Sequence, residues 1–379
     1  MLLLPILLAS LSLPARAEWL KALPEAVARS KTSNRPILLD FQAPWCYSCY
    51  YMEQRVLSKP AFAEKAKSLV PVKLDVDTDD GSALKEKLHV TFLPTYVVLG
   101  PGGDKELGRI IGEQTEADFL YKLAALTGGR GTDDAAVLAR QRKIKAGDLA
   151  ELERELDARA DCRTPYAVEY GQAFVAKLPP PRRAKLLAKE RASLESLASS
   201  KLFVPAESRC ADFRSGVEAL ADVDEALGDT AARESALDRA IAQLEADQPA
   251  VGADRNRDDN LRLFLDMRGD EAKLAAHYEA LIRAYPNDYV YAYRWARHLV
   301  ERGRAGEALP WIDKADRRAY GANRLMVTDV RARALAALGR SAEGKALLER
   351  DLKASRGRFP DEEPLLRKTL AELSARPQR

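Results

Sequence analysis

The chain has 379 residues, of which 46% are hydrophobic and 31% charged, a composition typical of a globular protein. At this length two or three domains are expected rather than a single core. The 60 basic and 57 acidic residues nearly balance and are interspersed, so the chain lacks the clustered Lys and Arg of a nucleic-acid footprint. We therefore expect no nucleic-acid partner.

Residues 1–17 have the pattern of a secretory signal rather than of mature structure. An apolar run from Leu2 to Leu13 precedes small residues at Ala15 and Ala17, which match a cleavage site after Ala17. The run is too short to span a bilayer, which takes about 20 residues. No Lys or Arg precedes the run, which departs from the usual pattern of a secretory signal. An uncleaved anchor or a buried helix is the alternative interpretation. We expect a periplasmic protein with no stable membrane span after cleavage.

In chain order, the first part of the sequence alternates helical and strand patterns. The expected elements are a helix at 19–31, a strand at 37–41, helices at 50–56 and 61–68, a strand at 69–76, a helix at 79–88 capped by residues 79–82, strands at 95–99 and 106–111, and a helix at 115–126. The last two strands flank a Gly-rich turn and predict a hairpin. This order predicts a mixed sheet flanked by helices.

The sequence after this first unit is helical in character. We place one domain at 18–128, a linker at 129–134, a helical region at 135–210 and helical repeats at 211–379. Four glycines separate helical stretches at intervals of 41, 34 and 36 residues: Gly228, Gly269, Gly303 and Gly339. This period is close to the 34 residues of tetratricopeptide repeats, which the region resembles.

One repeat carries a cluster of aromatic residues. The cluster comprises Tyr289, Tyr291, Tyr293 and Trp295. Repeat helices of this kind form concave binding surfaces, so the cluster is a candidate lining for a protein-binding site. Packing between helices is the alternative, and we favour it for at least two of the four. A protein partner on the repeats is therefore expected.

Two of the four cysteines lie 48 residues apart in the helical region, at Cys162 and Cys210. Export makes a disulfide between them chemically feasible, and a structural disulfide is the preferred interpretation. A second redox pair and two free thiols are the alternatives. A zinc site is not expected, because it needs a second CxxC or paired histidines. The only histidines are scattered: His89, His277 and His298.

Cys46 and Cys49 form a CxxC pair that follows the expected strand at 37–41 and opens a helix. A cysteine at a helix start faces unsatisfied N–H groups and the positive end of the helix dipole, which lower the pKa of its thiol. Cys46 is therefore expected to attack a disulfide, and Cys49, one helical turn later, to resolve the mixed disulfide. A static disulfide or a metal half-site is the alternative.

The segment from Asp40 to Cys49 resembles the active-site segment of the thioredoxin superfamily. Two further motifs follow in the family's order: residues 92–95, which match the segment carrying the cis-proline, and Gly112 after the hairpin. The resemblance spans residues 19–126 and implies a thioredoxin-like domain. Within the superfamily it is most similar to periplasmic domains such as the thioredoxin-like end of the membrane thiol:disulfide interchange reductase.

The resemblance implies roles for individual residues. Asp40 ends a buried strand, where desolvation raises the pKa of its carboxyl group, and in the family this acid relays protons to the second cysteine. Lys73, on the next expected strand, corresponds to the lysine that pairs with this acid in the family. A strand-ending or turn-capping role for Asp40 and a plain loop proline at Pro94 are the alternatives. The implied substrate-binding residues are Trp45, Leu93, Pro94 and Thr95.

The family pattern is broken at two places. Tyr47 and Ser48 separate the cysteines where thioredoxin has Gly-Pro, so the reduction potential cannot be transferred. Gln42 replaces the usual aromatic residue, which implies a different partner surface.

We expect an exported thiol:disulfide oxidoreductase without a cofactor, in which a reductase is favoured over an oxidase or isomerase. Its partners would be protein thiols or disulfides and a redox protein that resets the dithiol. A repeat scaffold in which the thioredoxin-like domain is only a binding module is the alternative function.

Overall fold

The computed structural model describes residues 17–130, 179–198, 213–246 and 250–375, together with a few positions between 143 and 154. Four expectations fall largely or wholly outside these residues: the signal segment apart from Ala17, most of the linker, most of the helical region at 135–210, and the Cys162–Cys210 disulfide.

The first domain is built on a four-stranded mixed sheet with the order β2-β1-β3-β4. β1 (Ile37–Gln42) runs parallel to β2 (Val70–Asp75) and antiparallel to β3 (Thr95–Leu99), which forms a hairpin with β4 (Glu106–Ile111). This confirms the expected mixed sheet and hairpin. The central strands are apolar along most of their length because helices cover both faces of the sheet.

The alternation of side chains along β1 divides the core into two layers. Ile37, Leu39 and Phe41 pack with α1 (Leu23–Ser33) and α4 (Asp79–Lys87). Leu38 points to the opposite face. That face is covered by α2 (Tyr47–Met52), its π-helical continuation η1 (Glu53–Leu57), α3 (Pro60–Ala66) and α5 (Glu116–Thr127). Asp40 follows Leu38 by two residues and therefore lies on the α2 side.

Two local expectations differ in detail from the structure. α2 begins at Tyr47, earlier than the expected start at residue 50, because Cys46 acts as its N-cap. The cap of α4 is Thr78, whose hydroxyl accepts a hydrogen bond from the N–H of Gly81. The expected cap at 79–82 was wrong, since those residues form the first turn of the helix.

The rest of the described chain is entirely helical. The helices are α9 (Pro180–Ala198), α10 (Phe213–Leu227), α11 (Thr230–Ala246), α12 (Arg255–Arg268), α13 (Glu271–Ala284), α14 (Val290–Glu301), α15 (Ala305–Asp316), α16 (Gly321–Ala337), α17 (Ser341–Ser355) and α18 (Glu363–Ala375). This confirms the predicted all-α second part. Among the helices of the described residues, none is long and apolar enough to cross a membrane.

The four predicted turn glycines each lie just after a helix. Gly228, Gly269, Gly303 and Gly339 follow α10, α12, α14 and α16, and each has a φ between 75° and 80°. Only glycine adopts this left-handed conformation without steric cost, so each one ends its helix and lets the next fold back antiparallel.

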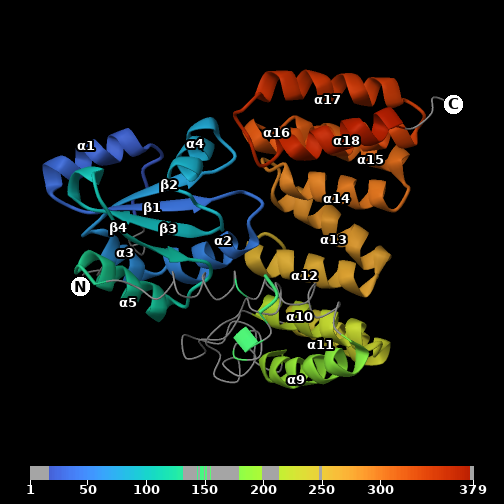
Figure 1. The fold of residues 1–379 in the computed structure, drawn as a ribbon, viewed down its shortest axis with the longest axis horizontal. Helices are drawn as coiled ribbons and strands as arrows, with labels where there is room; N and C mark the ends of the chain where they lie inside the picture. Colours follow the sequence, from blue (N-terminus) through green and yellow to red (C-terminus); the bar gives the residue numbers. More distant parts are fainter. Residues whose placement is uncertain are drawn as a thin grey trace, which may run out of the picture.

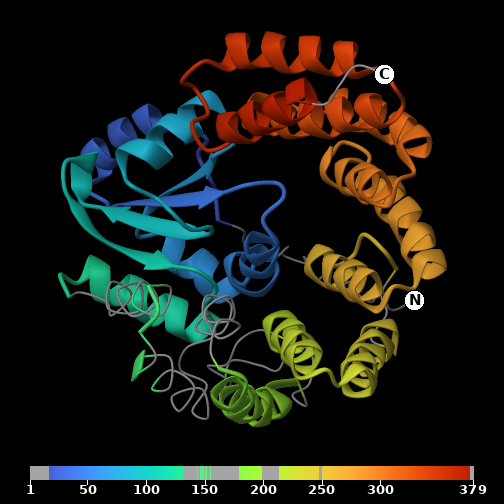
Figure 2. The same ribbon diagram turned by 45° about the vertical axis from the view of Figure 1, so that its right-hand side comes forward.

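The helices are stacked side by side next to the thioredoxin-like domain (Figure 1). Figure 2 shows them as an arc that runs from α9 and α10 to α17 and α18, with its inner side facing α2. The beginning of α2, where the CxxC pair lies, is therefore close to the middle helices of the arc. We call this inner side the concave face.

Candidate functional site

The two cysteines of the CxxC pair form a disulfide at the start of α2. Their Cα atoms are 5.2 Å apart, and the exposed fractions of Cys46 and Cys49 are 5% and 6%. The backbone N–H of Cys49 points at the Sγ atom of Cys46, with 3.1 Å between N and S. In the reduced state the same N–H would favour a thiolate on Cys46, because a hydrogen-bond donor stabilises an anion.

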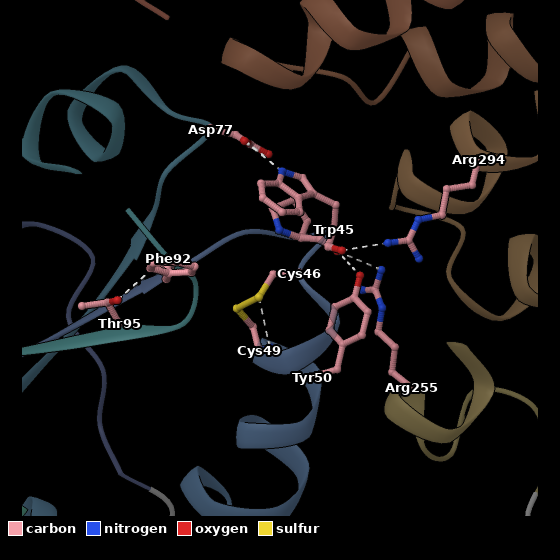
Figure 3. Close-up of a disulfide and its surroundings, with 10 residues drawn as sticks. Trp45, Cys46, Cys49, Tyr50, Asp77, Phe92, Thr95, Arg255 and Arg294 are labelled. Atoms are coloured by element: carbon pink, nitrogen blue, oxygen red, sulfur yellow. Dashed lines mark hydrogen bonds between the residues drawn. A yellow bond between two sulfur atoms is a disulfide. The ribbon is translucent and has the colours of Figure 1, made fainter. Parts of the chain in front are cut away.

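The loop of residues 92–95, of which Figure 3 labels Phe92 and Thr95, lies on one side of this disulfide. The Leu93–Pro94 peptide is cis, as the family resemblance implied, and Leu93 packs against the same apolar cluster that contains both cysteines. The N–H of Gly112 donates to the carbonyl of Pro94 at 2.9 Å. The Thr95 hydroxyl donates to the carbonyl of Phe92 at 2.8 Å. The loop is thus held from both ends.

Asp40 is a buried carboxylic acid on β1, with an exposed fraction of 2%. Desolvation raises the pKa of its carboxyl group to about 7, an effect that Lys73 opposes and Glu53 reinforces. Within the described part of the chain its Oδ1 atom has no hydrogen-bond partner. Asp40 is therefore poised to gain or lose a proton near neutral pH.

Lys73 lies opposite Asp40 in the register of β1 and β2. Its ammonium group forms an ion pair with Glu53 at 2.5 Å, however, rather than with Asp40. It also lies 5.0 Å from the centre of the Trp19 ring. Lys73 thus acts on Asp40 through its charge and not through a direct bond, which differs from the implied pairing.

Trp45 connects the two parts of the chain. Its indole N–H donates to Asp77 at 3.1 Å, and its ring contacts both the thioredoxin-like core and the core of the helical repeats. Asp77 also accepts a hydrogen bond from the Asn323 amide of α16 at 3.2 Å. Burial raises the pKa of Asp77 to about 6, although both hydrogen bonds oppose the shift.

Two arginines of the helical repeats bind the backbone directly before Cys46 (Figure 3). Arg294 of α14 donates to the Trp45 carbonyl at 2.8 Å, and Arg255 of α12 donates to the Pro44 carbonyl at 3.3 Å. The Tyr50 hydroxyl also donates to the Pro44 carbonyl, and the Arg255 guanidinium lies 4.3 Å from the centre of the Tyr50 ring.

Arg294 belongs to a buried ionic cluster around Asp259, whose side chain is completely buried. Its carboxylate contacts Arg262 at 2.9 Å, Arg294 at 2.5 Å and Arg214 at 3.0 Å. Burial alone raises the pKa of Asp259, but the three guanidinium groups hold it well below its usual range. The Arg214 guanidinium in turn lies 3.7 Å from the centre of the Tyr47 ring.

A second set of contacts joins the loops after β2 to the far end of the arc. The N–H of Ala322 donates to the Asp77 carbonyl at 2.9 Å. A Cβ atom on Gly321 would lie 1.8 Å from that same carbonyl oxygen, so only glycine permits this approach. Ion pairs between Arg358 and Asp79 and between Lys85 and Asp361 extend the contact.

Sequence reasoning missed the contacts between the repeats and the active-site loop. The only local signal is the run from Asp254 to Asn260, which contains no apolar residue although most of it is helical. These residues are nonetheless largely buried, with Asp258 and Asp259 fully so. A polar run of this kind indicates a helix that faces a second polar partner rather than water.

The aromatic cluster of α14 and its N-cap does not form an open binding surface. Its four members are all buried, with exposed fractions of 1% to 6%. They pack in the repeat core, and Tyr291 also accepts a hydrogen bond from Arg255 at 3.3 Å. The interpretation of these residues as packing, favoured for at least two, holds for all four: Tyr289, Tyr291, Tyr293 and Trp295.

No group of three or more His, Cys, Asp or Glu side chains in the described parts of the chain is arranged to hold a metal ion. The roles of the predicted site residues remain predictions. The structure brings Trp45, Cys46, Cys49 and Leu93 into one apolar cluster.

Comparisons with known proteins match the first domain. A family model described as thioredoxin-like matches residues 18–101. The thioredoxin of Mycolicibacterium smegmatis is 36% identical over 92 residues, which cover 24% of this chain and 79% of that protein. The thiol:disulfide interchange protein DsbD 2 of Pseudomonas aeruginosa is 35% identical over 98 residues, or 25% of this chain. The chain spans only 16% and 17% of the length of the first two interchange proteins it matches.

Two solved structures were also found to be similar to the chain. A thioredoxin from Thermus thermophilus is 30% identical, with coverage of 29% of this chain and 87% of that one and a TM-score of 0.28. A Podosopora anserina protein with nearly identical TPR-like repeats is 16% identical, with coverage of 59% and 98% and a TM-score of 0.35.

Proposed function

The chain belongs to the thioredoxin family, and from this premise we propose that it is an exported protein-disulfide reductase that uses Cys46 and Cys49. The observation that carries the proposal is the disulfide between these residues at the N-terminus of α2. The buried Asp40, whose pKa is raised to about 7, lies in the same domain. Thiol:disulfide exchange is the activity that thioredoxin-like relatives share.

The reaction begins with the reduced dithiol. The Cys46 thiolate attacks one sulfur of a substrate disulfide, which forms a mixed disulfide and releases the other substrate sulfur as a thiolate. Cys49 then loses its proton and attacks Cys46, which restores the Cys46–Cys49 disulfide and releases the second substrate thiol. Two electrons pass from the dithiol to the substrate. A protein thiol donor must return them before the next cycle.

Asp40 supports exchange chemistry at Cys49. Resolution of the mixed disulfide requires a group that takes the proton of Cys49, and a buried acid with a pKa of about 7 can do so near neutral pH. The substrates we propose are disulfide-bonded proteins of the periplasm. Export rests on the signal pattern of residues 1–17, and the similarity to interchange proteins is consistent with that compartment.

The helical arc favours a second candidate function. Because the concave face holds the thioredoxin-like domain through Arg255, Arg294 and Asn323, the chain is also compatible with a scaffold in which that domain is a binding module. A protein partner would then bind elsewhere on the repeats. This candidate predicts no turnover of disulfides.

Reduction of insulin by the full chain with dithiothreitol as donor separates the two functions. We expect turnover by the wild-type chain and none by the Cys46→Ser variant. Equal rates for the two chains, or no turnover by the wild type, would reject the reductase. As a control, Ser58→Ala, which removes a hydroxyl that donates to the carbonyl of Gln54 at 3.2 Å, should behave as wild type.

A further inference from the structure

The peptide group directly before Cys46 is held by a cation from the second domain. The Trp45 carbonyl, which accepts the hydrogen bond from Arg294 at 2.8 Å, belongs to the same peptide group as the N–H of Cys46. Arg255 holds the preceding carbonyl at 3.3 Å. Charged donors form the stronger class of hydrogen bond, and burial strengthens them further. The backbone that positions Cys46 is therefore fixed from outside the thioredoxin-like domain.

The charges in this region do not cancel. Arg214, Arg262 and Arg294 share the single buried carboxylate of Asp259. Glu218 is a further partner of Arg214, at 3.5 Å, but its side chain is 42% exposed and its charge is screened by water. The guanidinium groups thus leave an excess of positive charge beside the beginning of α2.

The other charged groups around the site come from both domains. Arg255 is neutralised by its ion pair with Asp288. On the thioredoxin-like side, Lys73 pairs with Glu53. Burial raises the pKa of Asp40 to about 7, so its negative charge is only partly present near neutral pH, whereas Asp77, with a pKa of about 6, is mostly negative there. These groups weaken the positive excess of the Asp259 cluster only in part.

We propose that Arg294, supported by Arg255, is a positioning residue of the redox site and stabilises the Cys46 thiolate from the helical repeats. A nearby cation lowers the free energy of a thiolate relative to the thiol. The repeats are then a component of the redox centre, and the dithiol of the full chain is less reducing than it would be without them. This inference rests on the proposed function in that Cys46 is the attacking thiol.

The test measures the pH dependence of Cys46 alkylation by iodoacetamide in the reduced full chain, with peptide mass spectrometry to identify the site. In the Arg294→Gln variant we expect the midpoint of the profile to move up by about one pH unit, which is the shift typical of a lost nearby charge. The thiolate population below the midpoint then falls about tenfold. At a pH above both midpoints, where Cys46 of the reduced chain is a thiolate, the dithiol potential falls by about 30 mV, the equivalent of a tenfold factor for a two-electron couple.

Two variants distinguish charge from structure. Arg294→Lys keeps the positive charge and should keep the profile near that of the wild type. Arg297→Gln removes an exposed arginine of the same helix, paired with Glu301 at 3.5 Å, and should leave the profile unchanged. A profile for Arg294→Gln that matches that of Arg297→Gln would overturn the proposal, as would an equal shift in Arg294→Lys.

Gly321→Ala provides an independent variant in case Arg294→Gln fails to fold. Its Cβ atom would clash with the Asp77 carbonyl, so this contact between the domains must open, while every residue of the Asp259 cluster stays unchanged. We expect an upward shift of the Cys46 profile here too, and an unchanged profile in a chain whose domains have separated would contradict the proposal. Alkylation of Cys46 needs no disulfide turnover. If the wild type fails to reduce insulin, the proposed function is rejected, but the alkylation profiles still test the role of Arg294.

Discussion

Replacement of Asp40 by Asn tests the buried acid through the stability of the oxidised chain. The pKa of Asp40 is raised from 3.8 to about 7 by burial, so the folded state holds a proton that the unfolded state has lost between these values. The wild type therefore loses stability as the pH rises through this window. Asn does not titrate, so any change in the free energy of unfolding that the substitution itself causes is the same at every pH.

The expected size of this effect follows from linkage. Between pH 4.5 and pH 8.5, the free energy of unfolding of the wild type should fall by about 3 kcal/mol relative to Asp40→Asn. Urea unfolding of both oxidised chains at the two pH values measures the difference. Asp104→Asn, in an exposed turn, serves as the matched control. A difference between Asp40→Asn and wild type that stays constant across this range would refute the assignment of a raised pKa to Asp40.

Three further predictions concern the site and its support. Cys49→Ser should trap a mixed disulfide between Cys46 and a substrate protein that non-reducing gels resolve; failure to trap one, with Cys46 reactive, would contradict the two-step exchange. Asn323→Ala removes a hydrogen bond to Asp77 as well as the one that Asn323 accepts from the N–H of Tyr320. It should weaken docking by about 1 kcal/mol, seen as faster hydrogen exchange across the contact, at residues 77–81; unchanged exchange there would contradict this contact. Phe264→Ala opens a cavity in the repeat core, where Phe264 is fully buried, and should cost about 3–5 kcal/mol of unfolding free energy; a smaller loss in urea unfolding would show that the core relaxes around it.

The thioredoxin-like domain could be predicted from the sequence because its patterns are local. The apolar run at Ile37, the CxxC pair and the Gly-rich hairpin turn each specify a short stretch of backbone, and β1, β3 and β4 lie close to their expected positions. The repeat glycines were equally predictable. A left-handed turn after a helix strongly favours glycine, whatever surrounds it.

The docking of the two parts could not be predicted, because it depends on residues far apart in sequence. Arg294 and Trp45 are separated by 249 positions, and nothing near either residue indicates the other. The resemblance implied that Lys73 pairs with Asp40, whereas its ion pair is with Glu53. The sequence could not indicate this, because Glu53 lies on the π-helical turn η1 and not on a neighbouring strand. The aromatic cluster around Tyr291 was ambiguous because helix packing and an open surface require the same residue types.

The reduction potential of the Cys46–Cys49 couple in the full chain tests the central claim most directly. Equilibration in dithiothreitol redox buffers, with alkylation and mass spectrometry of the two cysteines, gives this value. The proposed reductase predicts a two-electron transition nearer to the potential of thioredoxin, about −270 mV, than to that of a strong oxidant. A value near about −120 mV would contradict a reductase, and the absence of any transition at Cys46 and Cys49 would contradict exchange chemistry altogether.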